Sequence, residues 1–190
     1  MSDKECRVFY KVSDPSKASE GLSRYKKYVD GLAFDEENIG ALKDLLSIAE
    51  KIYGDKCEIL LMESKETLVY ALNTLGKSKS RILIALNELK DLAELRQVYG
   101  NYKNMEFGVR VTKPTLNLMH LARQGIKFVV IPPTLIRGRL ISEAKARKIS
   151  VIAHPVNDVA TYVKLLELGV SAVVTTNPAV KRGAKKLLRL

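Results

Sequence analysis

The amino-acid sequence predicts an α/β protein that folds as a compact (β/α)8 TIM-like barrel, with parallel strands alternating with helices in one domain over residues 1–190. Eight short apolar runs recur at spacings of roughly 21–27 residues, and a segment with helical periodicity follows each run. The runs are apolar at consecutive positions, as expected for parallel strands that are buried on both faces. A doubly wound sheet is the alternative, but eight even repeats without a glycine-rich first turn favour the barrel.

The eight apolar runs are predicted to be strands because they are short and rich in Val, Ile, Leu and Phe. They are bounded by glycine, proline or charged residues, which is typical of buried strands rather than of helices. The predicted strands span residues 7–12, 29–34, 56–62, 81–86, 105–111, 127–131, 150–153 and 171–174.

The segments between the runs are predicted to be helices because their apolar residues recur three and four positions apart. Residues with short polar side chains precede several of these segments and are predicted to cap them. The predicted helices span residues 16–28, 39–53, 65–75, 89–99, 115–124, 138–148, 159–169 and 179–190. The predicted caps are Ser64, Thr112, Asn157 and Asn177.

Composition narrows the class of protein. A chain of 190 residues with 46% hydrophobic residues is long enough to bury one core. The sequence has no apolar run long enough to span a membrane and no apolar amino-terminal signal, so we expect a cytoplasmic protein without a membrane partner. Cys6 and Cys57 fit no metal-binding or redox spacing, and we expect two buried thiols in a reducing compartment.

The charge is unevenly divided along the chain. Residues 1–100 contain 16 Lys and Arg against 17 Asp and Glu, whereas residues 101–190 contain 16 against 4. The total of +11 therefore comes from the second half. Such an excess of cations predicts a polyanionic partner for that half.

The loops after the carboxyl ends of the strands are where a barrel of this kind carries its function. In the first half these loops are mainly acidic, and Asp35, Glu63 and Glu88 could converge on a divalent metal ion. The acidic run at 35–37 is also typical of an ordinary helix start. His154 ends a strand and is a candidate acid–base group.

The loops of the second half are better suited to phosphate. Thr175 and Thr176 precede the last helix, whose first turn carries Lys181 and Arg182, and a helix start attracts anions. Arg137 follows an earlier strand of the same half. The sequence contains no phosphate-binding loop of the P-loop or dinucleotide type.

Residues 151–180, which read VIAHPVNDVATYVKLLELGVSAVVTTNPAV, resemble the carboxyl-terminal end of glycerophosphodiester phosphodiesterases. The matching positions are Val156, Asn157, Asp158, Leu168, Gly169, Val170, Thr175 and Pro178. The chain departs from that family at His154 and Pro155, where the family has Trp-Thr, and at Thr176, where it has Asp. The family's His-Arg-Gly is absent, and Asp35 alone remains of its Glu-x-Asp. The resemblance covers about 40 residues and implies a metal-dependent phosphodiesterase barrel.

The first half contains the stretches VFYKVSD, VDGLAFDEEN and LKDLLSIAEKIYGDKCEILLMES. In element order and turns, these stretches and the residues after them, about 100 in all, resemble a second family, protein component 3 of archaeal ribonuclease P. This resemblance implies a small basic barrel that binds RNA. The loop with Ser-Ser-Gly-Ala character that this family has late in its chain is replaced by VIAHPVND.

We expect the chain to be the RNA-binding protein subunit of ribonuclease P, supporting 5′-leader removal from precursor tRNA. Most of the phosphodiesterase catalytic set is missing, whereas binding RNA requires only clustered cations. The expected partners are ribonuclease P RNA, precursor tRNA and the other protein subunits, and any divalent metal is expected to enter with the RNA rather than as a cofactor of this chain. The expected phosphate and RNA contacts are Arg137, Arg139, Lys145, Arg147, Lys148, Thr175, Thr176, Lys181, Arg182, Lys185 and Lys186.

Two alternatives stay open. The first is a phosphodiesterase-like hydrolase, active or degenerate, with Asp35 and Glu63 as metal ligands and His154 as the acid–base group. The second is a phosphate-binding metabolic enzyme that uses the loops after the last two strands.

Overall fold

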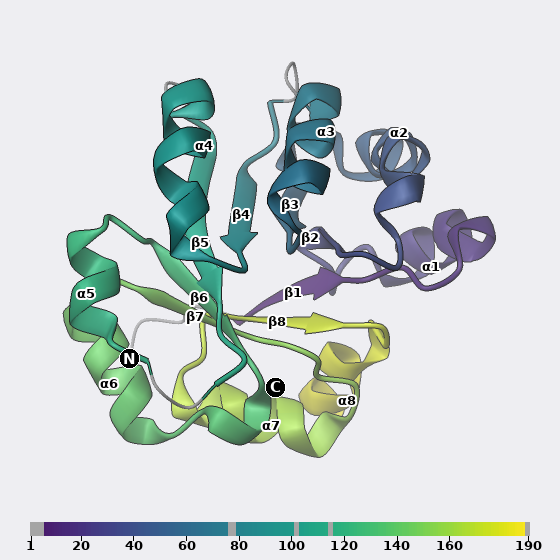
Figure 1. The fold of residues 1–190 in the computed structure, drawn as a ribbon. Helices are drawn as coiled ribbons and strands as arrows, with labels where there is room; N and C mark the ends of the chain where they lie inside the picture. Colours follow the sequence, from purple (N-terminus) through teal and green to yellow (C-terminus); the bar gives the residue numbers. More distant parts are fainter. Residues whose placement is uncertain (1–5, 76–78, 101–102, 114–115, 189–190) are drawn as a thin grey trace.

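The strands close into a barrel in the computed structural model, which describes residues 6–75, 79–100, 103–113 and 116–188 (Figure 1). Every strand pairs in parallel with the next one, and the last strand pairs with the first, with Arg7 opposite Ala172 and Tyr10 opposite Thr175. Eight helices alternate with the eight strands. The predicted (β/α)8 barrel is confirmed.

The predicted strands and helices agree with the observed ones to within a few residues. The strands are β1 Arg7–Tyr10, β2 Gly31–Phe34, β3 Glu58–Leu61, β4 Ile82–Leu86, β5 Met105–Arg110, β6 Phe128–Ile131, β7 Ser150–Ala153 and β8 Ala172–Thr175. The helices are α1 Ala18–Tyr25, α2 Leu42–Tyr53, α3 Lys65–Leu75, α4 Leu92–Tyr99, α5 Leu118–Arg123, α6 Gly138–Ala146, α7 Val159–Leu168 and α8 Ala179–Leu188. Of the predicted helical residues, 115, 189 and 190 lie outside the described part of the chain.

The helix starts differ from the prediction in two ways. Helices α1, α2 and α4 begin later than predicted because a 3-10 turn of three residues precedes each of them. Two predicted caps are wrong: Asn117, not Thr112, accepts a hydrogen bond from the first turn of α5, and Asp158, not Asn157, caps α7. In both cases the nearer polar residue reaches the free amide groups of the first turn.

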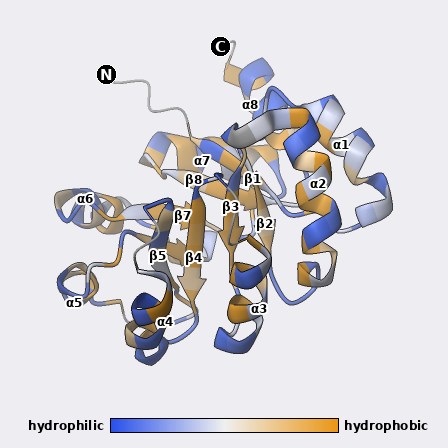
Figure 2. Ribbon diagram, turned by 90° about the horizontal axis from the view of Figure 1, so that it is seen from above, coloured by the Kyte–Doolittle hydropathy of each residue, from blue (hydrophilic) through white to orange (hydrophobic). Residues whose placement is uncertain are grey.

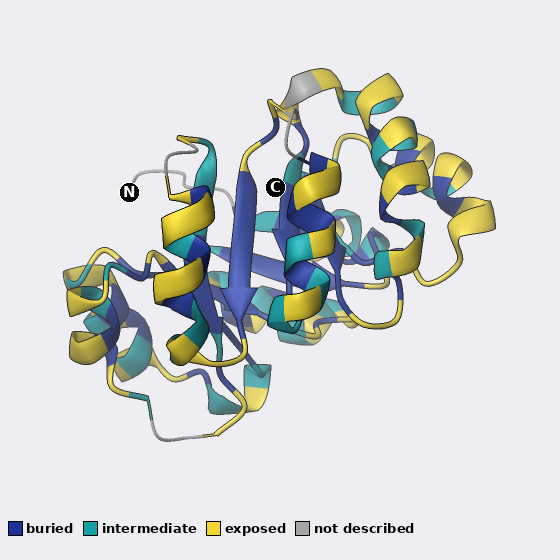
Figure 3. Ribbon diagram, turned by 45° about the horizontal axis from the view of Figure 1, so that its top comes forward, coloured by how far each residue is buried: buried dark blue, intermediate teal, exposed yellow. Residues whose placement is uncertain are grey.

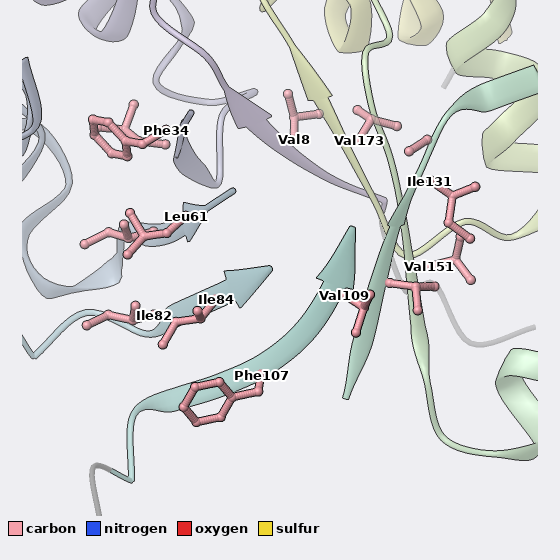
Figure 4. Packing of buried hydrophobic residues seen from close by; sticks show 14 of the residues in the cluster. Val8, Phe34, Leu61, Ile82, Ile84, Phe107, Val109, Ile131, Val151 and Val173 are labelled. Carbon is pink, nitrogen blue, oxygen red and sulfur yellow. The ribbon is translucent and has the colours of Figure 1, made fainter. Parts of the chain in front are cut away.

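Two apolar clusters form the core. The larger one lies between the strands and the helices, and Figure 4 shows part of it, including Val8 of β1 and Phe34 of β2. The smaller one contains no helix residue and fills the inside of the barrel. Its members are Phe9, Ala33, Leu60, Met62, Leu83, Ala85, Phe128, Val130, Ile152, Ala172 and Val174. Figure 3 accordingly shows buried strands and helices that are exposed on their outer faces, and the hydropathy in Figure 2 follows the same division.

Side chains alternate between the two clusters along each strand, as they must in a β-strand. On β1, Val8 belongs to the outer cluster and Phe9 to the inner one. The same alternation directs Arg7 and Lys11 towards the inside of the barrel, at its two opposite ends. On β5, Phe107 and Val109 face the helices. Glu106, Gly108 and Arg110 therefore face inside.

A chain of ion pairs links four strands at the amino-terminal end of the barrel. Arg7 Nη1 lies 2.5 Å from Glu58 Oε2, and Arg81 Nη1 lies 2.9 Å from the other oxygen of that carboxylate. Arg81 Nη2 also lies 2.7 Å from Glu106 Oε1. Each carboxylate thus contacts at least one guanidinium group, and the inward charges at this end neutralise one another.

The two cysteines are buried, as predicted, with 1% of Cys6 and 3% of Cys57 exposed. Burial raises the pKa of both thiols to about 12. The thiols are therefore protonated at neutral pH and behave as small apolar side chains. Within the described ranges, no helix is both long and apolar enough to cross a lipid bilayer.

One inward position of β5 must be glycine. A Cβ atom on Gly108 would lie 2.5 Å from Cδ2 of the Phe128 ring and 2.5 Å from the carbonyl oxygen of Phe128. Because one of these neighbours is backbone of the paired strand β6, a rotamer change of the ring cannot relieve the clash. Gly108 thus leaves room for Phe128 inside the barrel.

We predict that Gly108→Ala lowers the free energy of unfolding by about 1–3 kcal/mol, because the added methyl group overpacks the barrel. Urea unfolding followed by circular dichroism measures this change. The matched control is Gly138→Ala at the start of α6, where a Cβ atom meets nothing within 4 Å and alanine favours the helix. Equal stability of the two variants would contradict the packing described above.

Candidate functional site at the carboxyl ends of the strands

A cavity of about 300 Å³ opens at the carboxyl ends of the strands. Its lining comes from β5 and from the ends of β1, β2, β7 and β8 with the loops that follow them. The lining residues are Lys11, Asp35, Glu37, Arg110, His154, Pro155, Asn157, Val174, Thr175 and Thr176. The cavity therefore brings together residues that lie up to 165 positions apart in the chain, from 11 to 176.

Three charged groups meet on one side of the cavity. The Lys11 ammonium lies 2.7 Å from Asp35 Oδ2 and 2.5 Å from Glu37 Oε2. Only 8% of Lys11 and 6% of Asp35 are exposed. Burial lowers the pKa of Lys11, but the hydrogen bonds to the two carboxylates offset this effect, and the pKa lies above its ordinary value. Lys11 is therefore a cation at neutral pH.

The turn after β2 holds this group in place through Asn38, which is 5% exposed. The Asn38 side-chain amide donates to the carbonyl of Ala33 at 3.0 Å, and its Oδ1 accepts from the backbone N–H of Asp35 at 2.9 Å. The backbone N–H of Glu37 donates to Asp35 Oδ1 at 3.2 Å. The acidic run thus forms a fixed turn whose carboxylates face Lys11.

His154 and Arg110 also line the cavity. Burial and, after it, the positive charge of Arg110 lower the pKa of His154 to about 4. His154 is consequently a neutral imidazole at pH 7, with a lone pair that can accept a proton. Among the residues that the structure describes, the Arg110 guanidinium has no ion-pair partner.

Asn157 ties the loop after β7 to the end of β8. Its Oδ1 accepts hydrogen bonds from the Thr175 hydroxyl at 3.0 Å and from the backbone N–H of Thr176 at 2.9 Å. The side-chain amide of Asn177 donates to the carbonyl of Asn157 at 3.2 Å. The two hydrogen bonds to Oδ1 explain why the Asn157 side chain does not cap α7. They also occupy the Thr175 hydroxyl and the Thr176 backbone N–H, and both residues are predicted phosphate contacts.

Most of the predicted phosphate contacts lie away from the cavity. Thr175 and Thr176 line it, whereas Arg137 and the cations of α6 and its ends do not. Lys181 is 4% exposed, and its ammonium lies 3.2 Å from Asp30 Oδ2, just before β2 at the amino-terminal end of the barrel. The predicted cations outside the cavity lining are Arg137, Arg139, Lys145, Arg147, Lys148, Lys181, Arg182, Lys185 and Lys186.

Sequence reasoning overlooked Lys11 and Arg110. Each is the next-to-last residue of a predicted strand, and both are an even number of positions from inward residues, Phe9 on β1 and Gly108 on β5. That alternation is the signal that could have found them. The loops of the first half, which we expected to be mainly acidic, also lie beside a cation, because Lys11 contacts Asp35 and Glu37.

The metal ion that the phosphodiesterase resemblance implies does not fit these residues. Asp35 and Glu37 already bind the Lys11 ammonium, and Glu63 does not line the cavity. No group of three or more His, Cys, Asp or Glu side chains in the described parts of the chain could hold a metal ion. Asp35 and His154 are therefore the two members of the alternative set that the cavity contains.

Comparisons with known proteins give similarity in structure but not in sequence. No family model matches the chain, and no curated protein matches it in sequence. A phosphodiesterase from Oleispira antarctica, solved with the product sn-glycerol-3-phosphate, has a TM-score of 0.69 at 13% identity over 95% of this chain and 96% of that one. A glycerophosphodiester phosphodiesterase from Parabacteroides distasonis has a TM-score of 0.69 at 11% identity over 97% and 98%.

A deoxyribose phosphate aldolase from Aeropyrum pernix is also similar, with a TM-score of 0.66 at 14% identity over 96% of this chain and 90% of that one. At such identities these likenesses show the shared barrel fold. The phosphodiesterase neighbours agree with the resemblance of residues 151–180. The ribonuclease P resemblance receives no support from them.

Glu63, just after β3, is a buried carboxylate without a hydrogen-bond partner for either oxygen among the described residues. Only 1% of this residue is exposed. Burial, with the nearby charges of Glu36 and Asp35, raises its pKa to about 7. The ionised form of Glu63 is therefore disfavoured in the folded protein.

We predict that Glu63 makes the protein less stable as the pH rises from its ordinary pKa near 4.5 to about 7. Over this range the unfolded state releases the proton of Glu63 while the folded state keeps it, so the free energy of unfolding falls as the pH rises. Relative to the wild type, Glu63→Gln should gain about 2.5 kcal/mol of unfolding free energy between pH 5 and pH 8. Urea unfolding at both pH values measures this gain, and Glu50→Gln on the exposed side of α2 is the control. A constant difference between wild type and Glu63→Gln would exclude the effect.

Proposed function

We propose that the cavity binds the phosphate group of a small phosphodiester and that the protein is a phosphodiester hydrolase that works without a bound metal ion. The observation that carries this proposal is the Arg110 guanidinium, which has no partner among the described residues and shares the cavity with the neutral His154 and the Lys11 cation. The phosphodiesterases among the structural neighbours support the same class of reaction.

Arg110 is suited to anchor the phosphate. A guanidinium group presents parallel N–H donors that match two phosphate oxygens, and it keeps its charge at any physiological pH. The Lys11 ammonium has three N–H donors, of which two are directed at Asp35 and Glu37. The cavity thus holds two cations that attract a phosphate and two carboxylates that limit the net charge.

His154 is suited to take the proton of the attacking water. In the proposed step, the water oxygen forms a bond to phosphorus, its proton passes to the imidazole, and the bond from phosphorus to the leaving alcohol breaks. The leaving alkoxide takes a proton from solvent at the mouth of the cavity. The imidazolium that forms is stabilised by the negative phosphate, which opposes the effect of Arg110 on the histidine.

We predict hydrolysis of sn-glycero-3-phosphocholine or bis(p-nitrophenyl) phosphate in the presence of EDTA. His154→Gln should lower kcat by about 100-fold or more, because it removes the base. Arg110→Gln should mainly raise KM, because it removes the anchor of the ground-state phosphate. Arg139→Gln, an exposed arginine outside the cavity, is the control. An inactive wild type, or full activity of His154→Gln, would refute the proposal.

A second candidate function, RNA binding, is favoured by a surface between α1 and α8. The Arg24 and Arg182 guanidinium groups each lie 5.6 Å from the centre of the Tyr25 ring. The acidic Asp30 nearby is already bound to Lys181. The α1–α8 surface is defined by Arg24, Tyr25 and Arg182; the exposed Lys26 and Lys27 directly follow α1, and the exposed Lys186 lies four residues after Arg182 on α8. Cations that surround an aromatic ring are typical of surfaces that bind single-stranded nucleic acid.

The expected role in ribonuclease P is a finer form of this second candidate. RNA binding by the α1–α8 surface could serve that role, although the comparisons give it no support. Precursor tRNA is therefore one of the two RNAs that we would test, beside an unstructured oligonucleotide.

We predict that a single-stranded RNA binds the protein with an affinity that falls steeply with salt. The double variant Arg24→Gln with Arg182→Gln should flatten the slope of log K against log salt by roughly 1.4, since each neutralised phosphate contributes about 0.7. Fluorescence anisotropy between low and physiological salt measures the slope. Lys43→Gln with Lys51→Gln, two exposed positions of α2, is the matched control. Absence of binding at low salt would exclude this candidate.

A further inference from the structure

The position of Lys11 is set by the barrel itself. Its backbone N–H donates to the carbonyl of Thr175 at 2.8 Å, which continues the pairing of β1 with β8. The alternation of β1 then directs the side chain inward, with the same orientation as Phe9. The ammonium is therefore held at the inner wall of the cavity, and only 8% of the Lys11 residue is exposed.

The groups around the Lys11 ammonium resemble the surroundings of a bound cation. Asp35 and Glu37 belong to one turn, and their carboxylates converge on Nζ at 2.7 Å and 2.5 Å. Asp35 is 6% exposed, and a buried carboxylate requires a positive charge close by. Carboxylate oxygens are also the ligands that a hard divalent cation prefers; Asp35 offers them from the interior and Glu37 from the surface, with 77% of its side chain exposed.

The charge of this group differs from that of a metal site. One ammonium and two carboxylates leave a net charge of −1, and the nearby Arg110 brings the side chains of this wall to neutrality. A divalent ion added to them would have to compete with an ammonium group that cannot leave. The described residues offer no third carboxylate or imidazole that contacts the same point.

We propose that the Lys11 ammonium is a built-in cation that stands where a divalent metal ion would otherwise bind between Asp35 and Glu37. This inference deepens the proposed function, on which its consequence for catalysis rests: the chain itself supplies the positive charge at the phosphate. Metal binding is then blocked by one side chain, and removal of that side chain exposes a latent site for a divalent cation.

The test uses the full chain and compares Lys11→Ser with the wild type. In EDTA, the variant should melt at a lower temperature than the wild type, because Asp35 loses its counter-charge. Free Mn²⁺ at a concentration of about 100 times its dissociation constant should raise the melting temperature of the variant by roughly 5 °C, whereas the melting temperature of the wild type should not change. Calorimetric titration with Mn²⁺ should show one site in the variant and none in the wild type.

Two further variants separate this proposal from its alternatives. Lys11→Ser with Asp35→Asn should lose the Mn²⁺ response, since it removes the main ligand. Lys17→Ser is the matched control, because Lys17 pairs with Asp14 at 3.3 Å on the exposed surface. If Lys11→Ser does not fold, Lys11→Gln removes the charge with less loss of volume.

The outcomes are distinguishable from those of the hydrolysis assay because no substrate is present. Stoichiometric Mn²⁺ binding by the wild type would overturn the inference, as would a folded Lys11→Ser or Lys11→Gln protein that ignores Mn²⁺. An Mn²⁺ response confined to the Lys11 variants, together with an inactive wild type, would support the built-in cation and reject only the proposed hydrolysis.

Discussion

The pairing of β1 with β8 is the constraint on which the rest of the structure depends. It closes the barrel, and it also sets which side chains of β1 point inward. Because the side chains of a strand alternate, placing Phe9 in the inner cluster directs Arg7 to one end of the interior and Lys11 to the other. A slip of one residue would turn both cations towards the helices and would leave Val8 inside.

The inward cations at both ends are paired with carboxylates from β3 and from the turn after β2. At the amino-terminal end, Glu58 forms an ion pair with Arg7. At the carboxyl end, Asp35 and Glu37 form ion pairs with Lys11. These carboxylates belong to the half of the chain whose formal charge is close to zero. Three of the 17 acidic residues of that half thus pair with the inward cations of β1.

The sequence was sufficient to predict the barrel, because the prediction depends on the even spacing of eight apolar runs along the chain. An error of a few residues at the end of one strand or helix does not change that spacing. It was also sufficient to place Asp35 and His154 at the ends of strands, where the cavity contains both. It was not sufficient for Lys11 and Arg110, since a charged residue near the end of a predicted strand does not by itself show whether its side chain faces the inside of the barrel or the helices. The burial of Lys181 depends on its partner Asp30, which is 151 positions away and close only in the fold.

Among the described residues, the ion pairs of Arg7, Glu58, Arg81 and Glu106 lie at the amino-terminal end of the barrel, and the inner apolar cluster separates them from the cavity, which opens at the carboxyl ends of the strands. A molecule that enters there has to leave by the same way. For a substrate that is split in two, the fragment nearer the mouth must depart first, while the fragment held deeper competes with the next substrate. An ordered release, with inhibition by only one of the two products, would then follow from the architecture of the barrel rather than from the chemistry of the reaction.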